Sequence, residues 1–391
     1  MSTTRILIVD DEASSRNLLR KTLSVYSNLD IVGSVSTCRI ALSKIPQVNP
    51  DIVILDLDMP DTDVTQILLE IRKSHPDLPV LMLCTKKHNK NAARVLAALA
   101  AGANDYIPKS EKLSAESGAT EEFRVELFKK LRPFCQGPLK QQTLKRLKGT
   151  QQAPEANFHG KELPTKTEIH ERPRTSKKDE ASRIDILAIG VSTGGPQALE
   201  KVLPKLPEDF PVPIVIVQHM PSNFTGILAK RLNSKSSLFV KEGQKGDTLR
   251  PGQAWLAAGG MHMVVQPGKN KIQINTHMGP PENSCRPAVD VLLRSVADCY
   301  GSHALAVILT GMGQDGLRGC ESIQEFGGTI YAQDEESSVV WGMPGALSQA
   351  GLADKVLSLD AMAAEITRRV WQGRVKPSST HTSWNQRSLA T

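Results

Sequence analysis

Three side chains suited to acyl-transfer chemistry, Ser192, His219 and Asp315, each come after an apolar segment. The segments have the length of β-strands and span residues 184–189, 212–217 and 304–309. Because the carboxyl ends of parallel strands meet at one edge of a sheet, strands of one sheet would bring the three side chains together. Serine, histidine and aspartate can act as nucleophile, general base and orienting acid. The pattern therefore predicts a Ser-His-Asp site.

The turn that carries Ser192 reads Gly-Val-Ser-Thr-Gly-Gly over residues 190–195, and a helix is expected from Pro196. Glycines let the backbone turn sharply, and a helix N-terminus offers free N–H groups to an oxyanion. The backbone N–H groups of Thr193 and Met312, both in glycine-flanked turns, are the predicted oxyanion donors. On its own, such a turn is more typical of a phosphate-binding loop or of a purely structural turn.

Other residues compete for the same roles. Thr193 is an alternative nucleophile, although its secondary hydroxyl is more hindered. His262 lies in a turn that leads into a strand and is an alternative base, whereas His303 precedes a strand and should lie at the opposite edge. Asp334 follows the expected strand at residues 329–333 and is an alternative acid.

A second chemical cluster is predicted near the N-terminus, where Asp10, Asp11, Asp56 and Lys109 stand at the ends of expected strands. Three carboxylates repel one another unless a cation lies among them, and oxygen ligands suit Mg²⁺. A divalent metal beside one carboxylate, with a lysine to steady the transferred group, is what phosphoryl transfer to an aspartate needs. Exposed acidic strand ends would explain any one pair but not all four positions.

The elements around both clusters alternate between strands and helices, which favours an α/β fold with two doubly wound, mainly parallel sheets. The expected domains are residues 1–136 and 183–375. A basic, proline-bearing flexible linker is predicted at 137–182, and a disordered tail at 376–391.

Composition limits the class of protein. The 391 residues are 40% hydrophobic and 23% charged, with a net charge of +7 that is concentrated in the predicted linker. We interpret this charge as a solvated tether rather than a nucleic-acid contact. The six cysteines show neither metal-ligand spacing nor a disulfide framework, which suits a reducing cytoplasm. Neither a signal peptide nor a membrane-spanning stretch is expected.

The first domain resembles a response-regulator receiver. The resemblance is carried by Asp10-Asp11, by Asp56 in the segment Leu-Asp-Leu-Asp-Met-Pro, and by Lys109. Tyr106 falls at the aromatic position whose rotamer follows phosphorylation, while Cys84 stands where the family has serine or threonine, with Thr85 next. The resemblance implies phosphorylation of Asp56 from a histidine kinase, with Mg²⁺ held by Asp10, Asp11 and Asp56.

The second domain resembles the protein-glutamate methylesterases of bacterial chemotaxis. The motifs lie at residues 189–196, 217–221, 286–290, 309–316 and 342–344. The resemblance implies hydrolysis of glutamyl methyl esters on the cytoplasmic helices of chemoreceptors, often with deamidation of glutamines. Ser192 would be the nucleophile, His219 the base and Asp315 the orienting acid, without a cofactor for the hydrolase. Phosphorylation would relieve obstruction of the catalytic cleft by the receiver.

Two other output domains remain as alternatives. A DNA-binding domain is one, but no helix-turn-helix pattern follows the linker, and we expect no nucleic-acid partner. A nucleotide-binding domain that uses residues 190–195 as a phosphate cradle is the other.

Overall fold

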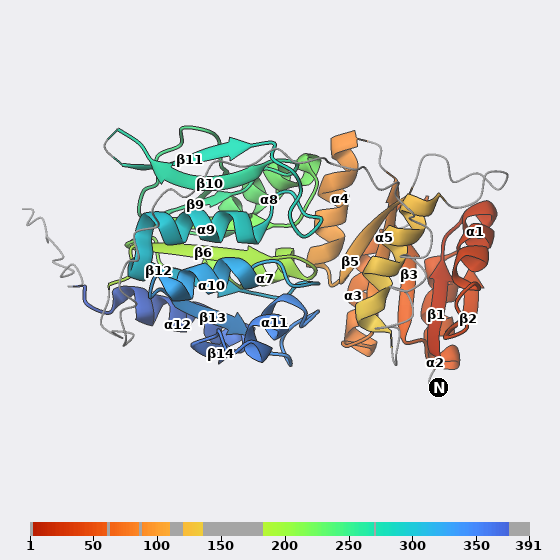
Figure 1. Cartoon of the computed structure of the whole chain (residues 1–391). Helices are drawn as coiled ribbons and strands as arrows, with labels where there is room; N and C mark the ends of the chain where they lie inside the picture. Colours follow the sequence, from red (N-terminus) through yellow and green to blue (C-terminus); the bar gives the residue numbers. More distant parts are fainter. Residues whose placement is uncertain are drawn as a thin grey trace, which may run out of the picture.

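The computed structural model in Figure 1 contains two α/β bodies, each built on a parallel sheet, so the predicted fold class is confirmed. The structure describes residues 3–60, 63–85, 88–109, 120–135, 183–269 and 271–374. The predicted linker at 137–182 and the predicted tail at 376–391 lie outside the described residues. Within those residues, no helix is both long and apolar enough to cross a membrane.

The N-terminal body has a five-stranded sheet in the order β2-β1-β3-β4-β5, with every pair parallel. Its strands are β1 (Thr4–Val9), β2 (Leu29–Val35), β3 (Ile52–Asp56), β4 (Val80–Thr85) and β5 (Asp105–Lys109). Its helices are α1 (Ala13–Leu23), α2 (Cys38–Val48), α3 (Val64–Ser74), α4 (His88–Ala100) and α5 (Glu121–Leu131), followed by η1 (Arg132–Phe134). Helices cover both faces, which is why the central strands are continuous apolar runs.

The C-terminal body has a seven-stranded parallel sheet in the order β14-β13-β12-β6-β7-β9-β8. The strands are β6 (Ile186–Val191), β7 (Ile214–Gln218), β8 (Phe239–Glu242), β9 (Gln253–Leu256), β12 (Ala304–Ile308), β13 (Thr329–Gln333) and β14 (Lys355–Leu357). Beside this sheet lies an antiparallel hairpin of β10 (His262–Pro267) and β11 (Ile272–His277).

Helices sandwich the seven-stranded sheet. One face packs against α9 (Val289–Tyr300), α10 (Leu317–Glu325), α11 (Met343–Gln349) and the hairpin. The other face packs against α7 (Gly195–Val202), α8 (Ser222–Lys235) and α12 (Leu359–Trp371). Alternate residues of β6 serve the two cores, with Ile186 and Ala188 on one side and Leu187 and Ile189 on the other.

One detail of β6 differs from the prediction. The strand was expected to end at Gly190, but it continues through Gly190 to Val191. Gly190 marks close packing instead of a turn, because a Cβ atom there would lie 2.4 Å from Val289 Cγ1 on α9. The turn falls later, at Gly194, whose φ of 78° favours glycine.

The strand order places the predicted site at a switch point of the sheet. β6 lies between β12 and β7, and the chain continues from β6 to β7, β8 and β9 on one side and from β12 to β13 and β14 on the other. In open α/β sheets, the crevice at the carboxyl ends of such strands is where ligands bind.

The N-terminal body lies against this same end of the seven-stranded sheet. In Figure 1, α4 and β5 of the N-terminal body stand at the junction, next to α7 and α8. Gln197 Nε2 on α7 donates to Leu99 O at 2.9 Å and also to Ala103 O. One buried apolar cluster runs from the core of the N-terminal body into the α7–α8 side of the C-terminal core.

Candidate active site

Ser192 directly follows β6 and is held by its backbone. Its N–H donates to Thr310 O on the neighbouring strand end at 3.0 Å. Its carbonyl oxygen accepts from Gly195 N at 2.8 Å and from Gln218 Nε2 at 2.9 Å. These three bonds fix the turn from both adjacent strands and leave the side chain on the wall of a cleft.

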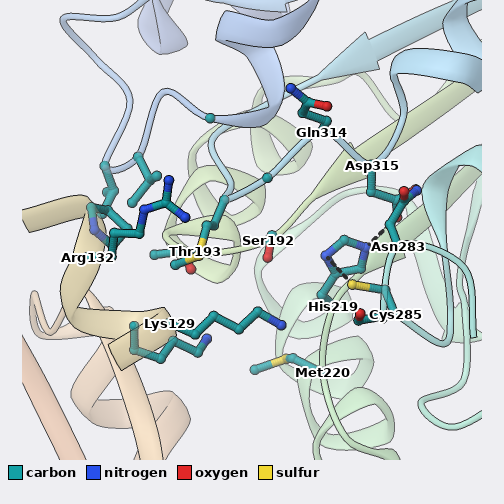
Figure 2. Close-up of a pocket in the computed structure, with 18 of the residues that line it drawn as sticks. Lys129, Arg132, Ser192, Thr193, His219, Met220, Asn283, Cys285, Gln314 and Asp315 are labelled. Atoms are coloured by element: carbon teal, nitrogen blue, oxygen red, sulfur yellow. Dashed lines mark hydrogen bonds and ion pairs between the residues drawn. The ribbon is translucent and has the colours of Figure 1, made fainter. Parts of the chain in front are cut away.

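His219 lies between Ser192 and Asp315 in Figure 2. It follows β7 directly, and its Nε2 lies 2.7 Å from Asp315 Oδ2. Within the described residues, no hydrogen bond joins Ser192 Oγ to the imidazole, so the nucleophile–base contact is open in this structure. Such contacts often close only when substrate is bound.

Asp315 is anchored at the N-terminus of α9. Its Oδ2 accepts from Val289 N at 2.7 Å, and its Oδ1 accepts from Asp290 N at 3.1 Å and Asn283 Nδ2 at 2.9 Å. Burial alone raises the pKa of Asp315, but the bonds from His219 and these donors outweigh it and hold the pKa below its usual value. The carboxylate therefore stays charged and fixed.

Asp290 makes the reciprocal contact to α10. Its Oδ1 accepts from Gly316 N at 2.9 Å and Gly319 N at 2.7 Å, while Asn283 Nδ2 donates to its Oδ2 at 2.8 Å. The N-terminus of α9 thus receives the carboxylate of Asp315 from the loop before α10, and the N-terminus of α10 receives that of Asp290 from α9. The helix dipole favours negative charge at both places. Neither Asn283 nor Asp290 is among the site residues predicted from the sequence.

Cys285 is a further neighbour that was not predicted from the sequence. Its Sγ lies 3.6 Å from His219 Nδ1 and within 4.8 Å of a carboxylate oxygen of Asp315. Burial by itself lowers the pKa of His219, but the hydrogen bonds to Asp315 and Cys285 outweigh it and raise the pKa to about 9. No spacing along the chain signals this contact.

The cleft has a volume of about 1900 Å³ and is lined from both bodies of the chain. Ser192 and Thr193 lie on one wall, and Lys129 and Arg132 face them from the N-terminal body (Figure 2). Met312 also lines this cleft. Within the described residues, neither Thr193 N nor Met312 N donates to an acceptor. Both groups are thus available to an oxyanion.

The competing residues are engaged elsewhere. Buried His262 accepts from Ala288 N at 3.2 Å and lies 3.0 Å from Pro280 O. His303 ends a 3₁₀ turn before β12, at the opposite edge. Asp334 accepts from Ser337 N and Oγ in a local turn. The Thr193 hydroxyl donates to Asp105 Oδ2 at 2.5 Å.

The acceptor of that last bond, Asp105, is the first residue of β5 in the N-terminal body. Asp105 Oδ2 also accepts from Lys130 Nζ at 2.6 Å. The next residue, Tyr106, stacks on Phe224 of α8 with ring centroids 5.0 Å apart. The aromatic position predicted to follow phosphorylation therefore lies at the interface, beside the turn of Ser192.

The four charged residues predicted in the receiver lie together. The ligand atoms of Asp10, Asp11 and Asp56 are within 4.8 Å of one another. Lys109 Nζ donates to Asp56 Oδ2 at 2.6 Å and Asp10 Oδ2 at 3.0 Å. Burial raises the pKa of Asp56 to about 6, against the opposing effect of Lys109. A trio of close carboxylate oxygens suits a hard divalent cation.

The two predicted switch residues on β4 differ in environment. Cys84 belongs to the buried apolar cluster, and burial raises the pKa of its thiol to about 12. Thr85 N donates to Asp58 Oδ2 at 2.8 Å.

Two known protein families match this chain. Residues 187–366 match the CheB methylesterase family, and residues 6–115 match the response regulator receiver domain. A protein-glutamate methylesterase/protein-glutamine glutaminase of Trichodesmium erythraeum (strain IMS101) is 44% identical, over 94% of this chain and 99% of its own. Its counterpart from Maricaulis maris (strain MCS10) is 36% identical, over 95% and 97%. The Thermotoga maritima CheB methylesterase catalytic domain is 42% identical, covers 48% of this chain and 99% of that one, and has a TM-score of 0.47.

Fold and site together define a response regulator whose output domain is a hydrolase. Because the similarity to these relatives extends over nearly their whole length, the chain belongs to the family of CheB methylesterases with an N-terminal receiver. The resemblance predicted from the motifs is confirmed, and a DNA-binding or nucleotide-binding output domain is not favoured.

Proposed function

We propose that this chain hydrolyses γ-methyl esters of glutamate on the cytoplasmic helices of chemoreceptors, and deamidates receptor glutamines at the same site. The observation that carries the proposal is the meeting of Ser192, His219 and Asp315 at the ends of three adjacent strands, on the wall of one cleft.

The proposed reaction begins with attack of Ser192 Oγ on the side-chain carbonyl carbon. Because Nε2 of His219 is bonded to Asp315, the opposite nitrogen, Nδ1, would take the serine proton. The imidazolium then gives that proton to the leaving group, so that methanol leaves from an ester or ammonia from an amide, and an acyl-enzyme remains. Water, activated by the same imidazole, releases glutamate and restores Ser192.

Two features would stabilise the transition state. Thr193 N and Met312 N would donate to the developing oxyanion, which is worth about 10²–10³ in kcat per donor in comparable sites. Asp315, kept charged by its helix N-terminus, would stabilise the imidazolium that forms.

We propose that the receiver controls this site through phosphorylation of Asp56 by a histidine kinase. Asp10, Asp11 and Asp56 would hold Mg²⁺, which supplies charge neutralisation for phosphoryl transfer. Negative charge added at Asp56 would disturb its pairing with Lys109 on β5. The same strand carries Asp105 and Tyr106, whose contacts with Thr193 and Phe224 hold the receiver over the cleft. Phosphorylation would thereby favour an arrangement that admits substrate.

Trapping with a serine-reactive organophosphonate, followed by peptide mass spectrometry, tests the proposed nucleophile. We expect the label on Ser192, its loss in Ser192→Ala, and unchanged labelling in Ser222→Ala, a serine on the wall of the same cleft. A label on another residue, or equal labelling of Ser192→Ala, would contradict the proposal.

A further inference from the structure

Gln218 is the last residue of β7, and its side chain bonds to the backbone of both Ser192 and His219. The residue is buried, with 2% of its surface exposed. Its Nε2 donates to Ser192 O at 2.9 Å and to His219 O at 3.2 Å. One amide group therefore joins the backbone of the proposed nucleophile to that of the proposed base. Hydrolysis as described above gives this side chain no task.

This bridge stands where the backbone pairing of β6 with β7 ends. Val191 and Gln218 are the last paired residues of the two strands, and His219 N still donates to Val191 O at 3.2 Å. The carbonyl group of Ser192 then accepts from Gly195 N, inside its own turn. The Gln218 amide therefore takes the place of the next backbone hydrogen bond between the two strands, since a side chain can satisfy a backbone group that has left the ladder.

The surroundings of the amide fix its orientation. The two acceptors are both carbonyl oxygens, which only the NH₂ end of the Gln218 amide can satisfy. The other end, Oε1, is buried, has no hydrogen-bond partner among the described residues, and lies against Gly195. A Cβ atom on Gly195 would lie 1.9 Å from this oxygen. Gly195 is the first residue of α7 and lacks a positive φ, so it is this contact that excludes a side chain there.

We propose that Gln218 is a positioning residue that sets the separation of Ser192 from His219. The contact between Ser192 Oγ and the imidazole is open in this structure, so the two side chains must approach each other before the proton moves. An amide that holds both carbonyl groups limits how far the two backbones move apart during that approach. Alignment matters steeply for such a step, and a misplacement of about 1 Å can cost about 100-fold in rate.

The rate at which an organophosphonate labels Ser192 tests this role without any receptor substrate. Gln218→Met keeps the length of the side chain but removes both hydrogen bonds, and we expect labelling to be about 10- to 100-fold slower per mole of folded protein. Gly195→Ala leaves the amide in the chain but displaces it, so it should slow labelling in the same way. If Gln218→Met does not fold, Gly195→Ala decides the question.

Ser295→Ala is the matched control. The Ser295 hydroxyl also joins two backbone groups, since it accepts from Val265 N at 3.0 Å and donates to Leu292 O at 2.7 Å. These residues belong to α9 and β10 and lie outside the lining of the cleft. We expect the control to lose thermal stability but to keep a labelling rate close to that of the wild type, with circular dichroism giving the folded fraction. A wild-type labelling rate in folded Gln218→Met, or equal slowing in Ser295→Ala, overturns the positioning role.

Steady-state methanol release gives a second readout, which rests on the proposed function. Because the buried amide acts on the alignment of Ser192 with His219 and not on substrate binding, we expect kcat to fall in Gln218→Met while KM stays close to its wild-type value. A rise in KM with unchanged kcat overturns the positioning role. If the wild type releases no methanol, the proposed function fails, while the labelling rates still decide whether Gln218 positions Ser192.

Discussion

His219 lies between two groups that both favour its protonated form. Asp315 accepts at Nε2 and Cys285 contacts Nδ1, and together they overcome the opposing effect of burial, so that the pKa is raised to about 9. A general base must be neutral to accept a proton. At pH 7, about one molecule in a hundred would carry a neutral imidazole at that pKa.

We therefore expect kcat/KM for methyl-ester hydrolysis to rise with pH, about tenfold per unit below the pKa, and to level off near pH 9. Cys285→Ala removes one interaction that raises the pKa, so its profile should move to lower pH. The Ser192→Ala rate, subtracted at each pH, removes spontaneous alkaline hydrolysis. A midpoint near the ordinary histidine value, or one that Cys285→Ala does not move, would contradict this reading of the site.

Asn283 holds two carboxylates in place by donating to both Asp290 and Asp315. Asn283→Asp keeps the shape and tolerates the positive φ of 51°, but it replaces the shared donor with a third carboxylate. We expect a loss of roughly 1 kcal/mol or more in the free energy of unfolding. We also expect kcat to fall more than KM changes.

Thermal unfolding and initial rates measure both effects. Gln314→Ala is the matched control, because Gln314 is exposed on the same cleft. If Asn283→Asp kept the stability and the kcat of the wild type, the amide that bridges Asp290 and Asp315 would not be needed.

At the scale of elements, the site depends on how closely α9 packs against β6. Gly190 lies on β6 under Val289, the first residue of α9, whose N–H donates to Asp315. A methyl group at position 190 would lie 2.4 Å from Val289 Cγ1 and 2.9 Å from Ile308 Cδ1. One of these elements would have to shift.

Gly190→Ala should therefore destabilise the protein by about 1–3 kcal/mol and lower esterase activity, because α9 and Asp315 move together. Gly226→Ala is the control, since a Cβ there meets nothing closer than 3.6 Å, and alanine favours its helix. Denaturant unfolding and methanol release would measure both variants. If the two variants had the same stability and the same activity, the packing of Val289 against Gly190 would not be what positions Asp315.

The elements that carry the proposed triad could be predicted from the sequence, whereas the contacts between distant loops could not. Ser192 and His219 directly follow buried apolar strands, and this pattern alone indicates a common sheet edge. Cys285 and Asn283 lie in an irregular loop between β11 and α9, where no periodicity specifies direction. Their positions depend on that loop folding back over His219. The periodicity of neighbouring residues in the sequence gives no information on such a contact.

At the scale of the whole molecule, the receiver and the catalytic domain share the wall of one cleft. Asp105 binds the Thr193 hydroxyl, Tyr106 stacks on Phe224, and Gln197 binds two receiver carbonyl groups. The two domains could be predicted from the motifs in the sequence. The contacts between them could not, because the strand and helix pattern of each domain gives no information about which surface faces the other domain.

Deleting residues 1–136 should raise esterase activity in the absence of phosphodonor, because it removes the receiver side of the cleft. An increase of roughly 5–150-fold would correspond to the usual range of coupling between sites. Methanol release per mole of folded protein is the measurement, with circular dichroism to establish that the shortened chain is folded. Unchanged or lower activity of the folded fragment would count against obstruction by the receiver.

The central claim is that Ser192 performs the hydrolysis and that Asp56 controls it. Methanol release from methylated receptor membranes tests it most directly, with wild type, Ser192→Ala and Asp56→Asn each assayed with and without a small phosphodonor and Mg²⁺. We expect wild-type release that rises with the donor, release by Asp56→Asn that does not change with the donor, and no release above background by Ser192→Ala. Undiminished release by Ser192→Ala would exclude Ser192 as the nucleophile.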